Sequence, residues 1–303
     1  MADRLRIGVV GAGVFGGYHA QKCRSHKRAE LVGVFDIDEE QSQALADKLG
    51  TEVAGSLEAL VRACDAIIVA CPATEHYAAA KAALEAGCDV LVEKPIAHTV
   101  ELAEELVALA ETEGRILQVG HQERFVAEAI GLDHIDEPPT AIRAWRHTGY
   151  SERGTDVSVA LDLMTHDIDL VLWLMETDPE SVAGEAEAVK SGTADVAEAT
   201  LSFPTTTAWL SASRVAEAPR REFELVYPSG VIAVDFGART LTNTSEHPVV
   251  ANFGDDPIAK DSLGAATDAF IRAVLDGEPV PITGGMGLRA LRYALMATEG
   301  KTA

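Results

Sequence analysis

Short apolar runs alternate with longer amphipathic segments through the first 120 residues of the chain. The runs are nearly continuous in Val, Ile and Leu, which is typical of strands that are covered on both faces. The segments between them have the apolar spacing of helices that bury one face. We predict strands at 5–10, 30–35, near 52–54, 65–70, 89–93 and 115–120, and helices at 14–27, 39–49, 56–63, 74–86 and 99–113.

This alternation predicts an α/β domain with a doubly wound parallel sheet, the Rossmann arrangement, over residues 1–121. The order of elements changes after residue 121, because several strand-like runs follow one another without helices between them. Neighbouring strands of this kind pair antiparallel, so we expect an α+β domain with a mainly antiparallel open sheet over 122–303. Its predicted strands are 141–148, 182–190, 196–203, 206–214, 221–227 and 231–236, and its helices are 158–175, 261–276 and 286–299.

A glycine motif follows the first predicted strand and opens the first helix. In "VVGAGVFGGYHA", Gly11, Gly13 and Gly16 form G-x-G-x-x-G, with Val14 and Phe15 between the last two. Gly11 permits a tight turn, Gly13 lets a pyrophosphate approach the helix N-terminus, and Gly16 lets helix and strand pack closely. In this context the motif predicts a dinucleotide site, whereas alone it would indicate only a glycine-rich turn.

Asp36 ends the second predicted strand, 20 positions after Gly16. A carboxylate there accepts hydrogen bonds from the adenosine ribose hydroxyls and repels a 2′-phosphate. No Arg or Lys follows in "DIDEE". The sequence therefore predicts NAD as the cofactor in preference to NADP.

Two further segments follow the ends of parallel strands, where ligands bind in open sheets. "ACPATEHY" places Pro72, Thr74 and His76 after the fourth predicted strand, and we assign them to the cofactor site. Thr74 could equally cap the next helix, and His76 could be a solvated side chain. "VEKP" places Glu93 and Lys94 at the end of the fifth predicted strand, and we assign both to the cofactor site. An ammonium group there could also stabilise developing alkoxide charge.

A very apolar segment, "VALDLMTHDIDLVLWLM", carries polar residues at helical spacing. Asp162 and His166 stand four residues apart and share a face, with Asp169 near it. Buried carboxylates and imidazoles need partners, so this cluster is either a structural network or a site. Asp167 lies one step around the helix, and we assign it a structural role.

The glycine loop, Asp36, "CPATEH", "EKP" and "DLMTHDID" together resemble the Gfo/Idh/MocA oxidoreductases, in the same order and over essentially the whole chain. The resemblance implies a nicotinamide-dependent dehydrogenase acting on a sugar or cyclitol. It assigns Lys94 to the cofactor ribose and substrate hydroxyl, and it implies a cis bond before Pro95. It makes His166 the general base, for which its ordinary pKa is suited, and Asp162 a group that orients substrate or histidine.

"GYSERGTDV" and "GHQERF" resemble the branch of this family that contains UDP-N-acetylglucosamine 3-dehydrogenases. We therefore assign Arg124 and Arg153 to substrate binding, because arginine grips phosphates with two parallel hydrogen bonds. The patch around 140–155 also holds Arg143 and Arg146, which strand alternation places on opposite faces. Ordinary salt bridges within the sheet are the alternative for this patch.

Composition argues against several other classes of protein. A formal net charge of −23 argues against a nucleic-acid partner, and no apolar run is long enough to span a membrane. The N-terminus lacks the apolar core of a secretory signal, and the four cysteines show neither CxxC nor zinc spacing, so we expect a cytoplasmic protein with free thiols and no metal. The apolar alternation in "TTTAWLSAS" suits a sheet face that pairs in a homodimer or homotetramer.

The sequence thus predicts an NAD-dependent dehydrogenase that oxidises a secondary alcohol of a nucleotide sugar such as UDP-N-acetylglucosamine at carbon 3. Three alternatives stay open. The substrate could be inositol or another free sugar or polyol. The chain could be a non-catalytic NAD-binding regulatory protein, or an enzyme that retains and recycles its NAD in place.

Overall fold

The computed structural model describes residues 4–299. They form two compact units. Residues 4–121 and 263–288 make the first unit, and residues 122–262 and 289–299 make the second. The segment 263–288 therefore lies with the Rossmann strands rather than with the rest of the second half of the chain.

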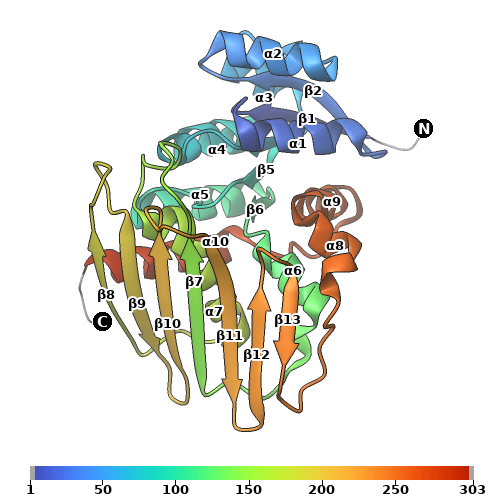
Figure 1. Ribbon diagram of the computed structural model, residues 1–303. Helices are drawn as coiled ribbons and strands as arrows, with labels where there is room; N and C mark the ends of the chain where they lie inside the picture. The colour runs from blue at the N-terminus through green and yellow to red at the C-terminus, as the bar shows by residue number, and fades with distance from the viewer. Residues whose placement is uncertain (1–3, 300–303) are drawn as a thin grey trace. The chain divides into compact units, whose positions relative to one another are not determined.

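The first unit is built on a parallel sheet. Within the described residues it has six strands in the order β3-β2-β1-β4-β5-β6, drawn from blue to green-cyan in Figure 1. β4 is buried throughout, and most residues of β1 and β5 are buried as well, as strands covered on both faces should be. The strands are β1 (Leu5–Val10), β2 (Ala29–Phe35), β3 (Glu52–Val53), β4 (Ala66–Val69), β5 (Asp89–Val92) and β6 (Leu117–Val119).

Local sequence explains where its helices begin and end. The side chains of Asp38, Ser56 and Thr99 accept hydrogen bonds from the first-turn amides of their helices, and Gly114 ends one helix in the left-handed conformation. The helices are α1 (Val14–Ser25), α2 (Glu39–Leu49), α3 (Leu57–Ala63), the 3-10 turn η1 (Ala73–Glu75), α4 (His76–Glu85), α5 (Val100–Glu113) and α9 (Ser262–Asp276).

α9 belongs with this unit because of what it buries. Its Phe270 and Ile271 are fully buried in the same core cluster as Leu5, Ile7 and Ala29. The amide of Gln118 on β6 also donates to the carbonyl oxygen of Ala266, at 2.9 Å. Apolar burial and a buried hydrogen bond therefore tie a late segment to the Rossmann core.

The second unit is built on a mainly antiparallel sheet, which confirms the predicted fold class together with the first sheet. Within the described residues the order is β13-β12-β11-β7-β10-β9-β8, and only the β7–β10 pair is parallel. β7 therefore separates two three-strand meanders (Figure 1). The strands are β7 (Ala141–His147), β8 (Ser181–Glu187), β9 (Val196–Ser202), β10 (Thr207–Ser213), β11 (Arg220–Tyr227), β12 (Gly230–Asp235) and β13 (Thr240–Asn243).

One face of this sheet packs against the predicted long helix, which contacts β7 and β10. The residues of β7 on that face, Ile142, Ala144 and Arg146, are buried, whereas Arg143 on the other face is exposed. The helical elements are α6 (Glu123–Ile130), η2 (Leu132–His134), a π-helical turn η3 (Ala160–Met164), α7 (Thr165–Met175), η4 (Phe253–Asp255), α8 (Pro257–Lys260) and α10 (Gly284–Glu299).

Candidate functional site

The glycine loop between β1 and α1 has a backbone that only glycine can supply at two positions. Gly11 has φ +100°, and a Cβ there would lie 2.6 Å from backbone atoms of Ala70 and Cys71. A Cβ on Gly16 would lie 1.8 Å from the carbonyl oxygen of Gly11. Gly13 instead faces open space at the N-terminus of α1, which leaves the helix end accessible to an anionic group.

The carboxylate of Asp36 is fastened to this loop. Its Oδ2 accepts from the backbone amide of Ala12 at 2.6 Å, and its Oδ1 accepts from that of Asp38 at 2.9 Å. Each carboxylate oxygen can accept more than one hydrogen bond, so Asp36 retains capacity for ribose hydroxyls. Its role in cofactor binding stays a prediction.

Apolar side chains stand unusually exposed around the same loop. Val14 is 54% exposed and Ile37, next to Asp36, is 91% exposed, although such side chains normally lie inside. Phe15 is half-buried and packs edge-on against Tyr18. A flat heterocycle would find apolar surface here, and Ile37 and Tyr18 are residues that the motif alone did not indicate.

Lys94 lies half-buried two residues after the end of β5, and its bond to Pro95 is cis, as the resemblance implied. Beneath it, Glu93 is buried and its Oε1 lies 2.8 Å from Nε2 of His19 on α1. Burial raises the pKa of Glu93, but the hydrogen bond from His19 and the charges of His19 and Lys94 outweigh it, so the net pKa is lowered. Glu93 therefore joins the strand end to the glycine-loop helix.

His76 supports the same turn from α4. It is 2% exposed, with Nδ1 2.7 Å from the carbonyl oxygen of Pro95 and Nε2 2.9 Å from that of Cys71. Burial lowers its pKa. With both ring nitrogens facing carbonyl oxygens, His76 is better placed to hold the turn than to contact a cofactor. Pro72, exposed, and Thr74, half-buried, lie at the start of the preceding η1.

In the second unit, Asp162 and His166 are both half-buried but belong to different kinds of helix. Asp162 lies in the π-helical turn, whereas His166 lies in the first turn of α7. π-helical turns occur frequently at functional sites because they re-aim side chains within a helix. The predicted single helix over 158–175 is therefore a composite, and its irregular part carries the predicted substrate-facing acid.

Two buried arginine–carboxylate pairs hold α7. Arg124 from α6 is 4% exposed and donates to both carboxylate oxygens of Asp169, at 2.6 and 2.5 Å. Arg146 from β7 donates to both oxygens of Asp167, at 3.0 and 2.7 Å. The structural role predicted for Asp167 is observed. Arg124, which we assigned to substrate binding, neutralises a carboxylate that would be costly to bury alone. Its role toward the substrate stays a prediction.

Arg153 is exposed in the loop between β7 and the π-helical turn. Its backbone amide donates to Oγ of Ser151 at 3.2 Å. The neighbouring Gly154 has φ +76°, and a Cβ there would lie 2.5 Å from Oδ2 of Asp162. The loop therefore approaches the acid closely. The substrate role of Arg153 stays a prediction.

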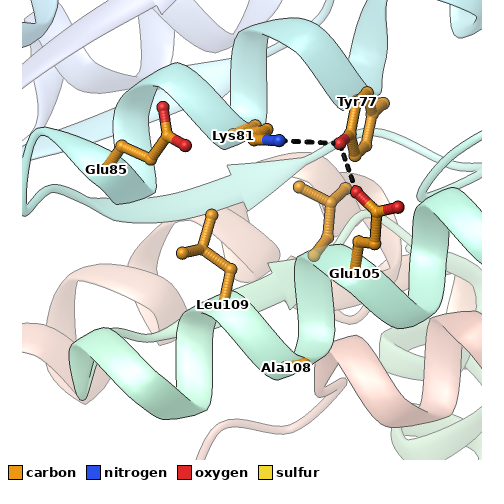
Figure 2. Close-up of a pocket in the computed structure, with 7 residues that line it drawn as sticks. Tyr77, Lys81, Glu85, Glu105, Ala108 and Leu109 are labelled. Atoms are coloured by element: carbon orange, nitrogen blue, oxygen red, sulfur yellow. Dashed lines mark hydrogen bonds between the residues drawn. The ribbon is translucent and has the colours of Figure 1, made fainter.

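A separate hollow of about 310 Å³ lies between α4 and α5 (Figure 2). Lys81 donates to the hydroxyl of Tyr77 at 3.0 Å, and that hydroxyl donates to Glu105 at 2.5 Å. The residues that line it are Tyr77, Lys81, Glu85, Glu105, Leu106, Ala108 and Leu109. The predicted site residues are not among them, so the hollow is not part of the candidate site.

Across residues 4–299, no group of three or more His, Cys, Asp or Glu side chains is placed to hold a metal ion. Among the same residues, no helix combines the length and the apolar character that crossing a bilayer requires.

Comparison with known proteins adds independent findings. Residues 5–121 match a family model described as an oxidoreductase family with an NAD-binding Rossmann fold, which confirms NAD as the predicted cofactor. Residues 134–233 match the Gfo/Idh/MocA C-terminal domain. Both units thus match parts of one kind of two-domain oxidoreductase.

Individual proteins similar to this chain are also dehydrogenases. A UDP-N-acetylglucosamine 3-dehydrogenase from Acidithiobacillus ferrooxidans is 32% identical over 300 residues, which covers 96% of this chain and 95% of that protein. A crystal structure of that enzyme aligns with a TM-score of 0.88 over 98% of each chain. An inositol 2-dehydrogenase from Rubrobacter xylanophilus is 31% identical, but over 60% of this chain and 55% of that protein.

Proposed function

This chain belongs to the Gfo/Idh/MocA family of oxidoreductases, and we propose that its substrate is a nucleotide sugar such as UDP-N-acetylglucosamine, oxidised at carbon 3. The observation that carries this proposal is the similarity to the Acidithiobacillus enzyme, which extends over both units and nearly the full length of both chains. Lys94, Asp162 and His166, the residues that the chemistry needs, are all present.

The chain's own groups can move the proton. The imidazole of His166 takes the proton from the substrate hydroxyl, and Asp162 orients that hydroxyl or the imidazole. The positive charge of the Lys94 ammonium group stabilises the negative charge that develops on the substrate oxygen. When bound, NAD supplies the hydride acceptor at its nicotinamide ring. The carbinol C–H bond breaks with its electron pair, the O–H bond breaks to give the proton, and a carbonyl forms.

The direct test is NADH formation by the purified protein with UDP-sugars, inositols and free sugars. We expect turnover with UDP-N-acetylglucosamine and much weaker turnover with inositols. His166→Ala should reduce kcat by about 10²–10⁴-fold, the usual contribution of a general base. NAD binding without turnover of any of these compounds would contradict the proposal and would favour a non-catalytic NAD-binding protein of the same fold.

A second candidate substrate is inositol or another free polyol. It is favoured by the partial similarity to several inositol dehydrogenases. The same panel separates the two, because preference for inositol over every UDP-sugar would select this alternative. Absorbance of NADH in the protein as purified would indicate a cofactor that is retained and recycled.

We also propose that the chain forms a homodimer or homotetramer through the sheet face opposite α7. On that face Trp145 and Trp209 pack edge-to-face with ring centroids 5.6 Å apart, and the guanidinium of Arg220 lies 3.7 Å from the centre of the Trp145 ring. Tryptophan and arginine are enriched at protein interfaces. A second copy of the chain would cover this aromatic surface.

A cytoplasmic location is proposed from the thiols. Cys23, Cys64, Cys71 and Cys88 are free, as expected in a reducing compartment. Burial raises the pKa of Cys23 to about 12, so this thiol acts as a small apolar group. Cell fractionation with an antibody to the chain would test the location.

A further inference from the structure

The loop that leads into the π-helical turn is held by a side chain from the far end of β10. Arg214 is 2% exposed. Its Nη1 donates to the carbonyl oxygen of Gly154 at 2.5 Å, and its Nη2 donates to that of Val157 at 2.8 Å and that of Ala194 at 3.2 Å. One buried guanidinium thus satisfies two carbonyl groups of a loop that has no strand partner of its own.

Thr193 adds a second contact to the same loop. Its hydroxyl lies 3.1 Å from the carbonyl oxygen of Thr155 and 3.0 Å from that of Val157. Together, Arg214 and Thr193 occupy the carbonyl oxygens of residues 154, 155 and 157. Because Thr193 lies in the loop between β8 and β9 and Arg214 directly follows β10, the conformation of 154–157 depends on residues about 40 to 60 positions away in sequence.

Asp195 fixes the supporting loop. It is fully buried, and its Oδ2 accepts from the backbone amides of Val189, Lys190 and Ser191 at 2.9, 2.5 and 2.8 Å. Its Oδ1 accepts from Oγ of Ser191 at 2.6 Å and lies 3.7 Å from Nε of Arg214. The carboxylate therefore balances the charge of the buried arginine while it orders the turn that carries Thr193.

The supported loop touches the predicted acid. Gly154 adopts φ +76°, which favours glycine, and the space where its Cβ would stand lies 2.5 Å from Oδ2 of Asp162. Displacement of the Gly154 backbone would change the space available to the Asp162 carboxylate. The position of the loop therefore limits the positions that the Asp162 side chain can adopt.

We propose that Arg214, supported by Asp195 and Thr193, is a positioning residue that holds the 154–157 loop against Asp162 and so sets the geometry of the substrate-orienting carboxylate. The proposal rests on the proposed function, because it gives Asp162 its role. These residues lie outside the motifs identified in the sequence, and they act through the loop and Asp162 rather than on the reacting atoms.

The test compares Arg214→Gln and Arg214→Lys with a matched control, Arg239→Gln, which removes an exposed arginine of the same unit. Arg214→Gln should lower kcat/KM for the sugar on the order of 100-fold, the scale of an ångström-size misplacement, while the Kd for NAD stays unchanged. Arg214→Lys keeps the charge beside Asp195 and should recover part of the loss. The control should match wild type.

Hydrogen exchange gives a second readout. In Arg214→Gln the amides of 151–158 should exchange faster, whereas those of β12 should not change. Wild-type kcat/KM together with unchanged exchange in 151–158 would overturn the proposal. If Arg214→Gln does not fold, Thr193→Val, which removes only the hydroxyl, decides by the same two readouts. If wild type turns over no sugar, the proposed function fails, and exchange in 151–158 alone decides whether Arg214 positions the loop.

Discussion

At the scale of single residues, the groups that support the candidate site come from segments far away in sequence. Gly11, Gly16 and Asp36 are recognisable because they stand at the fixed spacing of one dinucleotide-binding motif. His19 and Arg214 carry no local signal, because their partners, Glu93 and the 154–157 loop, lie far away in sequence. The pairing of Arg124 with Asp169 was not visible in the sequence for the same reason, since the two residues lie 45 positions apart.

Glu93 gives a pH-dependent prediction at this scale. Its folded pKa is lowered, so its contribution to stability is present above the unfolded value near ~4.3 and is lost as the pH falls through the folded value. Wild type should exceed Glu93→Gln in unfolding free energy at neutral pH, and the difference should shrink below about pH 4.3. Urea unfolding across the acid range measures this, with the exposed Glu180→Gln as control. A difference that persists unchanged in acid would contradict it.

At the scale of elements, periodicity predicted nearly all strands and helices of the first unit. Periodicity could not place β7 between β10 and β11. These strands lie far from β7 in sequence, and periodicity within one strand does not indicate which strands pair with it. α6 was not predicted, because its segment begins with two charged residues, Glu123 and Arg124, that read as exposed. Both are buried in the structure, where Arg124 pairs with Asp169 on a distant part of the chain. The π-helical turn was also not predicted, because its 5 residues are too few to show a period of their own.

The α7 helix provides a prediction at this scale. Arg124→Met should cost about 3–5 kcal/mol of unfolding free energy, because Asp169 would remain buried without its partner. The double variant Arg124→Met/Asp169→Leu should recover most of that loss, since an apolar pair of similar size needs no charge balance. Denaturant unfolding of both variants measures it. A double variant less stable than Arg124→Met would show that the pair is not the cause.

At the scale of the whole molecule, the aromatic sheet face predicts self-association. Trp209 is half-buried, beside Trp145. A stable interface buries roughly 800 Å² per partner, so Trp209→Arg at its centre should reduce the assembly to monomers at micromolar concentration. Sedimentation velocity measures this, and Arg239→Gln, away from the tryptophans, serves as control. A monomeric wild type would exclude the interface.

Oxidation of a nucleotide sugar by this protein is tested most directly by one measurement. Purified wild type and His166→Asn are compared for NADH formation with UDP-N-acetylglucosamine and NAD, after equal NAD affinity has been established for both. We predict steady turnover by wild type and a loss of at least about 10²-fold in the variant. Equal rates in the two proteins, or no NADH from wild type despite bound NAD, would contradict the claim.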